Sequence, residues 1–209
     1  MSAKGWPASL ADGSVGVRPL RVRDGPAWVE LRQRNERWLA SWEGRSEQQA
    51  PASWADRHSG TVFAAMLRVL RREARAGRSL PFALTYQGRL AGQVTASSVV
   101  RGAFDSASVG YWVDGALAGR DIMPTALALV VDHCFGPVGL HRIEANIRPD
   151  NAASRRVVDK LGFRCEGLHE RYLFIDGAWH DHLAFAITRE EVPGGLLRRY
   201  RQEGPAVRA

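Results

Sequence analysis

The spacing of the apolar residues changes near Pro81, and this change constrains the fold more than any other feature of the chain. Between residues 61 and 76 apolar side chains recur every three or four positions, which predicts a helix. Beyond Pro81, apolar and polar residues alternate over 81–86, 89–100 and 107–113, which predicts three strands joined by short turns. Helices followed by an antiparallel meander indicate an α/β protein.

The remaining segments extend this sheet in both directions. A strand over 15–20 and short helices over 24–35 and near 38–42 precede the long helix. After the meander, the patterns predict a helix over 123–135, a strand over 142–147, a helix over 152–161, and strands over 163–174 and 179–188. We therefore expect one mixed, mostly antiparallel sheet of seven strands with flanking helices.

The length of 209 residues suits a single domain. We place this domain at 15–188, between a flexible N-terminal tail over 1–14 and an arginine-rich C-terminal tail over 189–209. No apolar run approaches the roughly 18 residues that a membrane span requires, and the first residues lack the pattern of a signal peptide. We therefore expect a cytoplasmic protein that does not enter a membrane.

Charge and ligand residues restrict the partners only weakly. The formal net charge is +7, and nearly all of the positive charge comes from arginine, because Lys4 and Lys160 are the only lysines. Such a balance suits an anionic partner, whether a nucleic acid, a ribosome surface or a polyphosphate ligand. Direct nucleic-acid binding is compatible with it and not required by it. His180 and His182 share a strand face but have no third ligand in the sequence, so we expect no metal site.

Three consecutive features carry the functional signal. They are residues 110–113 (Gly-Tyr-Trp-Val), the loop 116–123 that opens a helix, and the segment 141–163, which contains Asn151-Ala-Ala-Ser154 and ends in Leu-Gly-Phe. Together they resemble the GNAT superfamily of N-acetyltransferases, and most closely its RimJ/RimL-type branch. The resemblance implies the GNAT fold, with a splayed central strand pair whose opened wedge takes the pantetheine arm of acetyl-CoA, the co-substrate.

The resemblance also implies the residues that contact acetyl-CoA. The strand edge near Val113 would pair with the pantetheine amides, and the amides at the start of the helix near Met123 would bind the pyrophosphate. By the same likeness, Asn151 hydrogen-bonds the pantetheine arm and Ser154 donates to the departing thiolate. The cofactor-binding residues are thus expected to be Tyr111, Trp112, Val113, Ala118, Gly119, Arg120, Asp121, Ile122, Met123, Asn151 and Ser154.

Asp121 is the main departure from the family pattern. The family carries glycine at this position in its Arg/Gln-x-x-Gly-x-Gly/Ala signature, whereas here a carboxylate would stand beside the pyrophosphate and repel it. Arg120 would offset part of that repulsion. Alternatively, Asp121 simply caps the helix. For Asn151 an N-cap role and a ligand role are compatible, and Ser154 is either a thiolate donor or an ordinary first-turn residue.

The catalytic groups used by some relatives are missing. The position of their tyrosine acid is Val158 here, and that of their glutamate base is Asn146. We therefore take Ser154, Glu144 and Tyr172 as the catalytic candidates. Glu144 shares a strand face with Asn146, although an ordinary surface carboxylate accounts for it equally well. Without a strong base, an α-amine with a pKa near 8 is a more suitable acceptor than a lysine, whose pKa lies near 10.4.

The acceptor site is expected on a separate segment. Trp38, Trp42 and Glu43 resemble the segment that precedes the acceptor site in RimJ-like enzymes, and two aromatic walls with an acid suit a peptide and its ammonium group. Core packing by these tryptophans is an equally good explanation. With Asn146 and Glu170 they form the predicted substrate-binding set.

The sequence therefore predicts an acetyl-CoA-dependent N-acetyltransferase that acts on the α-amine of a protein N-terminus, with ribosomal proteins as the first candidates. One alternative is acetylation of a small-molecule amine such as an aminoglycoside or a polyamine, which calls for an acceptor pocket with several carboxylates. Another is a non-catalytic ribosome- or RNA-binding GNAT relative in which Asp121 has weakened cofactor use.

Overall fold

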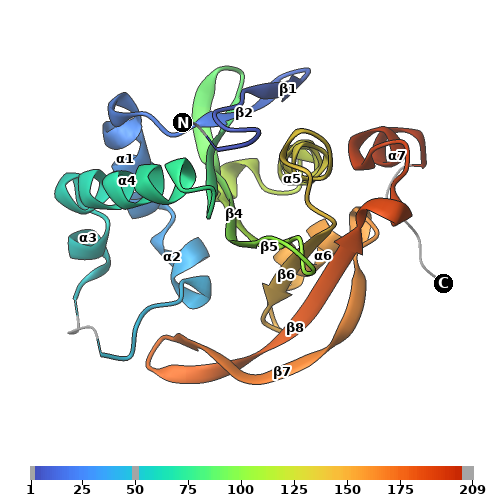
Figure 1. Ribbon diagram of the computed structural model, residues 1–209. Helices are drawn as coiled ribbons and strands as arrows, with labels where there is room; N and C mark the ends of the chain where they lie inside the picture. Colours follow the sequence, from blue (N-terminus) through green and yellow to red (C-terminus); the bar gives the residue numbers. More distant parts are fainter. Residues whose placement is uncertain (1–2, 49–51, 204–209) are drawn as a thin grey trace.

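The structure is a computed structural model that describes residues 3–48 and 52–203. Parts of the two expected tails, residues 1–2 and 204–209, and part of the loop around Pro51 lie outside the described residues. The described chain forms one mixed sheet with helices on both faces (Figure 1). The predicted fold class is therefore confirmed. None of the described helices is long and apolar enough to cross a membrane.

The sheet has eight strands, one more than the sequence predicts. Their spatial order is β1-β2-β3-β4-β5-β6-β8-β7, and every pair is antiparallel except β5 with β6. The strands are β1 (Leu10–Asp12), β2 (Val15–Pro19), β3 (Leu80–Tyr86), β4 (Arg89–Val100), β5 (Ser106–Val113), β6 (Arg142–Ile147), β7 (Arg164–Ile175) and β8 (Ala178–Thr188). The extra strand is β1, which lies inside the expected N-terminal tail and pairs with β2.

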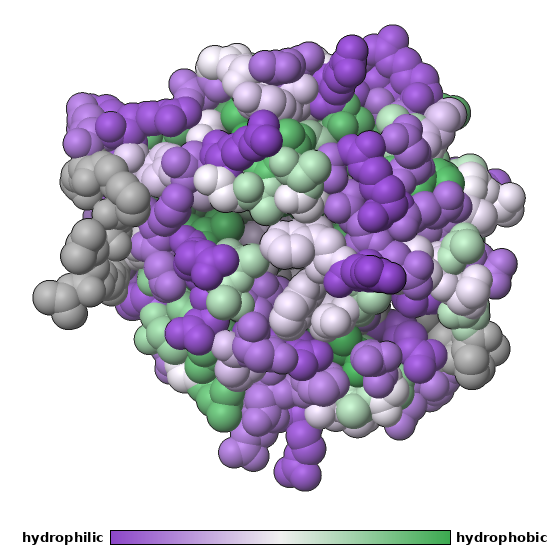
Figure 2. Space-filling view, turned by 180° about the vertical axis from the view of Figure 1, so that it is seen from behind, coloured by the Kyte–Doolittle hydropathy of each residue, from purple (hydrophilic) through white to green (hydrophobic). Residues whose placement is uncertain are grey.

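The helices divide between the two faces of the sheet. They are α1 (Gly25–Arg34), α2 (Glu36–Leu39), α3 (Trp54–Arg57), α4 (Gly60–Arg75), α5 (Ile122–His133), α6 (Ala152–Lys160) and α7 (Leu196–Glu203). Short helical turns connect some of these elements, among them the 3-10 turns η2 (Ala40–Trp42) and η5 (Arg189–Glu191). In Figure 1, α1 and α4 cover one face, and α5, α6 and α7 lie on the other. Figure 2 shows hydrophilic residues over most of one side of the molecule, with apolar side chains in small separate patches.

A hydrophobic core lies on each face of the sheet. The larger core surrounds α5, a helix with apolar residues on all sides that is buried along almost its whole length. The smaller core joins α1 and α4 to the opposite face through Trp28, Phe63 and Leu67. Each face of the sheet is therefore covered, which fixes the positions of the strand ends between the two layers.

The C-terminal segment differs from the expected tail. Residues 189–203 form η5 and α7, and the Leu196 side chain is completely buried. The Asp132 carboxylate on α5 accepts hydrogen bonds from the backbone N–H groups of Leu196 and Leu197, at 2.5 and 3.0 Å. Val192, Leu196 and Tyr200 recur every four residues and give this arginine-rich segment a buried apolar face. The helix is therefore part of the domain.

Candidate active site

The parallel pair β5 and β6 separates part of the way along. The two strands pair only from Ser106–Arg142 to Ser108–Glu144. Beyond these residues, β5 continues to Val113 and β6 to Ile147 without partnering each other. The two strands therefore splay as the sequence predicts, and each has a free backbone edge facing the other.

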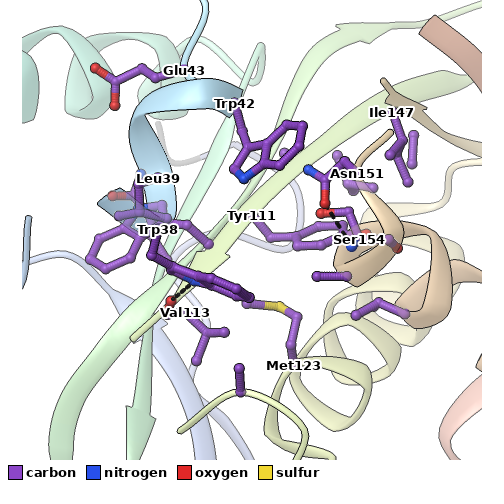
Figure 3. Close-up of a pocket in the computed structure, with 18 of the residues that line it drawn as sticks. Trp38, Leu39, Trp42, Glu43, Tyr111, Val113, Met123, Ile147, Asn151 and Ser154 are labelled. Carbon is purple, nitrogen blue, oxygen red and sulfur yellow. Dashed lines mark hydrogen bonds between the residues drawn. The ribbon is translucent and has the colours of Figure 1, made fainter. Parts of the chain in front are cut away.

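The free edges line a cavity of about 760 Å³. Tyr111 and Trp112 both line it, although consecutive residues of a strand point to opposite faces of the sheet. Tyr111 lies beside Ser154 on α6 (Figure 3), whereas Trp112 packs with the core under α1 and α4. The cavity therefore passes through the sheet, from the α5 and α6 side to the α1 side.

Backbone direction decides which residues of β5 offer free groups to the cavity. The N–H of Asp114 donates to Ala91 on β4 at 2.8 Å, so the N–H and C=O of Val113 point the other way, into the wedge. By the same alternation, the backbone groups of Val109 and Tyr111 face the wedge and those of Trp112 face β4. Trp112, one of the residues expected to bind the cofactor, therefore presents its side chain and not its amide to the site.

The N-terminus of α5 borders the cavity. Ala118, Gly119, Asp121, Ile122 and Met123 line it, whereas Arg120 is exposed and does not. The loop and helix start are also well suited to an anion, because the first N–H groups of a helix lack partners within it. This part of the predicted cofactor set is therefore brought together as expected, with Arg120 as the exception.

Asp121 neither caps α5 nor ties up its amides. Its side chain makes no cap hydrogen bond and instead pairs with the Lys160 ammonium on α6. This ion pair holds the pKa of Asp121 below its usual value, with a further hydrogen bond from Tyr200. The Asp121 backbone has φ of +56°, a left-handed conformation that glycine adopts freely and that aspartate tolerates. The backbone geometry thus explains why the family pattern has glycine here.

The start of α6 lies on the same side of the cavity. The Asn151 side-chain oxygen accepts a hydrogen bond from the Ser154 N–H at 3.0 Å, so Asn151 is the N-cap, and both residues line the cavity (Figure 3). The Tyr111 hydroxyl donates to the Ser154 carbonyl oxygen at 3.1 Å, and burial raises the pKa of this tyrosine. These contacts fix the first turn of α6 against β5.

Aromatic residues form the wall opposite α6. Trp38 and Trp42, from α2 and η2, both line the cavity, and the Trp38 indole N–H donates to the Val113 carbonyl oxygen at 3.1 Å (Figure 3). The Arg148 guanidinium lies 5.3 Å from the centre of the Trp42 ring and donates to the Ser41 carbonyl oxygen. The tryptophan segment predicted for the acceptor therefore does border the wedge.

Glu43 lines the cavity but its charge is already matched. Its carboxylate pairs with Arg32 and with Arg57, and His58 lies against it at 3.0 Å. In Figure 3 the Glu43 carboxylate points away from Trp42. The expectation that this acid meets the acceptor ammonium group therefore finds no support in the geometry.

Three other predicted residues do not line the cavity. Glu144 lies where β5 and β6 are still paired, and its carboxylate accepts from Arg142 at 2.6 Å. Glu170 is exposed on β7. Tyr172 is also on β7, where its hydroxyl accepts a hydrogen bond from the Asn146 side-chain N–H at 3.2 Å. Tyr172 thereby positions Asn146, which does line the cavity and whose side-chain oxygen is buried without a hydrogen-bond partner among the described residues.

Sequence reasoning missed several residues of the site. Their contacts are between segments far apart in the chain, so no local pattern marks them. Those that line the cavity are Trp28, Arg32, Arg148, Arg156, Lys160 and His182. The sequence pattern raises His182 only as a metal ligand, and within the described chain no three His, Cys, Asp or Glu residues are arranged to hold a metal ion.

His58 makes the stability of this region depend on pH. Burial, followed by the nearby Arg32 charge, lowers the pKa of His58 from 6.5 to about 4. The folded state therefore binds fewer protons than the unfolded state between these values, so stability falls as the pH drops through this window. From pH 7 to 4.5 we expect a loss of about 2 kcal/mol from this group. Urea unfolding of the wild type and His58→Gln measures it: the variant should lose less stability over the window, and equal losses would contradict the assignment.

The Asp121–Lys160 pair predicts a change in cofactor affinity. Asparagine also tolerates the left-handed backbone, so Asp121→Asn removes the carboxylate and releases Lys160, which lines the same end of the cavity. We expect acetyl-CoA to bind roughly three- to tenfold more tightly at low salt, with a smaller gain at high salt. Calorimetric titration at two salt concentrations tests this. Adding Lys160→Gln to the Asp121→Asn variant should remove the gain, and an unchanged dissociation constant at both salt concentrations would refute it.

Comparison with known proteins agrees with this geometry. Residues 14–164 match the family described as an acetyltransferase (GNAT) domain. The chain is 43% identical to Mycobacterium smegmatis RimJ, solved in complex with CoA-disulfide, with a TM-score of 0.92 over 99% of this chain and 100% of that one. It is 31% identical to the [ribosomal protein uS5]-alanine N-acetyltransferase of Escherichia coli (strain K12), over 88% of this chain and 93% of that protein.

A third relative matches over a shorter stretch. YjcK of Bacillus subtilis (strain 168) is 44% identical over 103 residues, which cover 49% of this chain and 57% of YjcK. The family match includes the splayed pair β5 and β6, the start of α5 and the start of α6. The chain therefore belongs to the GNAT family of acetyl-CoA-dependent N-acetyltransferases, in its RimJ-like group.

Proposed function

We propose that this protein transfers the acetyl group of acetyl-CoA to the α-amine of a protein N-terminus, with ribosomal proteins as the first candidates. The names of two extensively matching relatives, RimJ and a uS5-alanine N-acetyltransferase, support the choice of candidate. The choice of an α-amine rests on the charges that line the cavity.

No unpaired carboxylate lines this cavity within the described chain, and this observation carries the proposal. The acids that line it are Glu43, which is paired with two arginines, and Asp121, which is paired with Lys160. An amine must be neutral to attack a thioester. At pH 7 an α-amine with a pKa near 8 is neutral about two hundred times more often than a lysine amine near 10.4. A site without a base therefore favours the α-amine.

The same charges disfavour polycationic acceptors. Aminoglycosides and polyamines carry several ammonium groups, and a pocket that binds them needs carboxylates to match that charge. Arg32, Arg148, Arg156 and Lys160 instead give the cavity a majority of basic groups. The non-catalytic alternative depended on Asp121 obstructing the cofactor, and its pairing with Lys160 leaves the α5 amides open.

The residues present fit acetyl-CoA, whose thioester supplies the acetyl group. The free edge at Tyr111 offers N–H and C=O groups to the pantetheine amides, and the α5 N-terminus offers N–H groups to the pyrophosphate. Ser154 and the positive end of α6 lie where they stabilise negative charge on the departing sulfur. The unpaired oxygen of Asn146 accepts a hydrogen bond from the amine and orients it. Most of the rate enhancement then comes from holding the two reactants together.

A matched pair of peptides tests the proposal. One begins with a free alanine and contains no lysine; the other has the same sequence with a blocked N-terminus and one lysine. We expect acetylation of the first at pH 7 to be about two-hundredfold faster in kcat/KM, with the rate following deprotonation of an amine near pH 8. Equal rates, or a preference for the lysine peptide, would refute an α-amine specificity.

A further inference from the structure

The cavity ends on the α1 side in a buried guanidinium enclosed by tryptophans, here called the Arg32 cluster. The Arg32 guanidinium carbon lies 5.6, 5.0 and 5.1 Å from the ring centres of Trp28, Trp54 and Trp112. The Arg32 side chain is 9% exposed. Arg32, Trp28 and Trp112 all line the cavity, so the cluster is continuous with the wedge where the reaction takes place.

The cluster carries more positive than negative charge. Two guanidinium groups, of Arg32 and Arg57, share the single carboxylate of Glu43. His58 supplies no matching anion: its Nδ1–H donates to the Trp54 carbonyl oxygen at 2.8 Å, and its Nε2 lies 2.8 Å from the Arg32 guanidinium and 3.0 Å from the Glu43 carboxylate. Its pKa of about 4 keeps it neutral at cellular pH. One positive charge is therefore left without a matching anion inside the cluster.

Two buried donors in the cluster have no partner among the described residues. They are Nε of Arg32 and the indole Nε1 of Trp28. Both belong to residues that line the cavity, and a buried donor without an acceptor is costly to a protein. An excess positive charge together with unpaired N–H donors is the environment that a carboxylate group matches.

We propose that Arg32 and Trp28 form a subsite for a carboxylate side chain close to the N-terminus of the acceptor, an inference that rests on the proposed function. The Trp112 side chain extends from β5 to Arg32, so the subsite lies about the length of one tryptophan side chain from β5. The acceptor amine must lie beside β5. An extended peptide covers such a distance in about three residues. The acceptor is thus a protein whose first few residues include an aspartate or a glutamate.

Amidated hexapeptides test the inference. Each begins with alanine, followed by glycine and serine, with one aspartate at position two, three, four, five or six, and each has a control with asparagine at the same position. We expect the wild type to prefer aspartate over asparagine at one position by about tenfold in KM. In Arg32→Met the ratio should fall to about one, because the guanidinium is lost and the aliphatic part is kept.

Two variants guard against a purely structural effect. Arg32→Lys keeps a charge in the same space and should retain part of the preference. Arg57→Met removes the other arginine on Glu43, and with it the excess charge, but keeps the unpaired donors of Arg32 and Trp28. Because Arg57 does not line the cavity, this variant should lower the aspartate-to-asparagine ratio less than Arg32→Met does. A ratio that stays the same in Arg32→Met and Arg32→Lys, or that Arg57→Met alone abolishes, overturns the inference.

The remaining outcomes separate the two proposals. If alanine peptides are acetylated but none shows an aspartate preference, the carboxylate subsite is refuted and the proposed function stands. A tripeptide that begins with alanine is compared with its C-terminal amide as well. If the only carboxylate preferred is the free C-terminus of this tripeptide, the subsite binds a chain end and the inference about acidic side chains is refuted. If no alanine peptide is acetylated, the proposed function fails and the inference fails with it.

Discussion

Replacing Ser154 by alanine should lower kcat by about a hundredfold while leaving KM for acetyl-CoA within a fewfold of the wild-type value. Ser154 lines the cavity in the first turn of α6, and its hydroxyl is the donor proposed for the departing thiolate. A donor aimed at charge that develops during the reaction contributes mainly to the transition state, at about 2.7 kcal/mol for such a factor. Steady-state kinetics with an alanine peptide measures both constants.

Ser154→Thr is the matched control because it keeps the hydroxyl. It should retain most of the activity, whereas Asn151→Ala, which removes the N-cap and a proposed pantetheine contact, should act mainly on KM. An alanine variant at position 154 with wild-type kcat would leave this serine as a helix residue only. A large rise in KM without a fall in kcat would instead assign it to ground-state binding.

Replacing Gly92 by valine should destabilise the protein by about 3 kcal/mol and raise KM for acetyl-CoA. A Cβ at this position on β4 would lie 2.2 Å from the Trp112 carbonyl oxygen, which is backbone and cannot move independently of β5. The strand must shift or the pairing must break, and overpacking of this kind typically costs about 1–3 kcal/mol or more. The shift would move the wedge edge at Tyr111 and Val113, the edge proposed to contact the cofactor.

Gly110→Ala is the control for this prediction. Gly110 is on β5, two residues before Trp112, and also lines the cavity. No atom lies within 4 Å of a Cβ built at Gly110, so the effect of Gly110→Ala on stability should stay small. Urea unfolding reports the stability and kinetics with acetyl-CoA report the wedge. A Gly92→Val variant as stable as Gly110→Ala would show that β5 accommodates the side chain without strain.

The parts of the fold that local patterns determine could be predicted from the sequence. The alternation over β3, β4 and β5 and the turns between them gave the meander within one or two residues, because the period of a half-buried strand is visible locally. β1 could not be predicted, because three residues carry no period and the strand forms only by pairing with β2. α7 was obscured by its arginines, although its buried residues recur every four positions.

The candidate site was predicted where the motif is local and missed where it depends on tertiary contacts. Residues near the start of α5 and α6 were identified because a helix N-terminus and its cap are adjacent in the chain. Glu144 does share a strand face with Asn146, but the wedge opens only after residue 144, a point that β5 pairing decides. The partner of Asp121 is Lys160, 39 residues away, and nothing near Asp121 reveals it.

Intact-mass analysis of an acceptor protein tests the α-amine proposal most directly. Ribosomal protein uS5 with an unmodified N-terminal alanine would be incubated with acetyl-CoA and this protein, then analysed by tandem mass spectrometry. We predict the mass gain of one acetyl group, located on the N-terminal α-amine, and no gain when Ser154→Ala is used for the same short time. Acetyl groups on lysine side chains with the N-terminus unmodified would contradict the account.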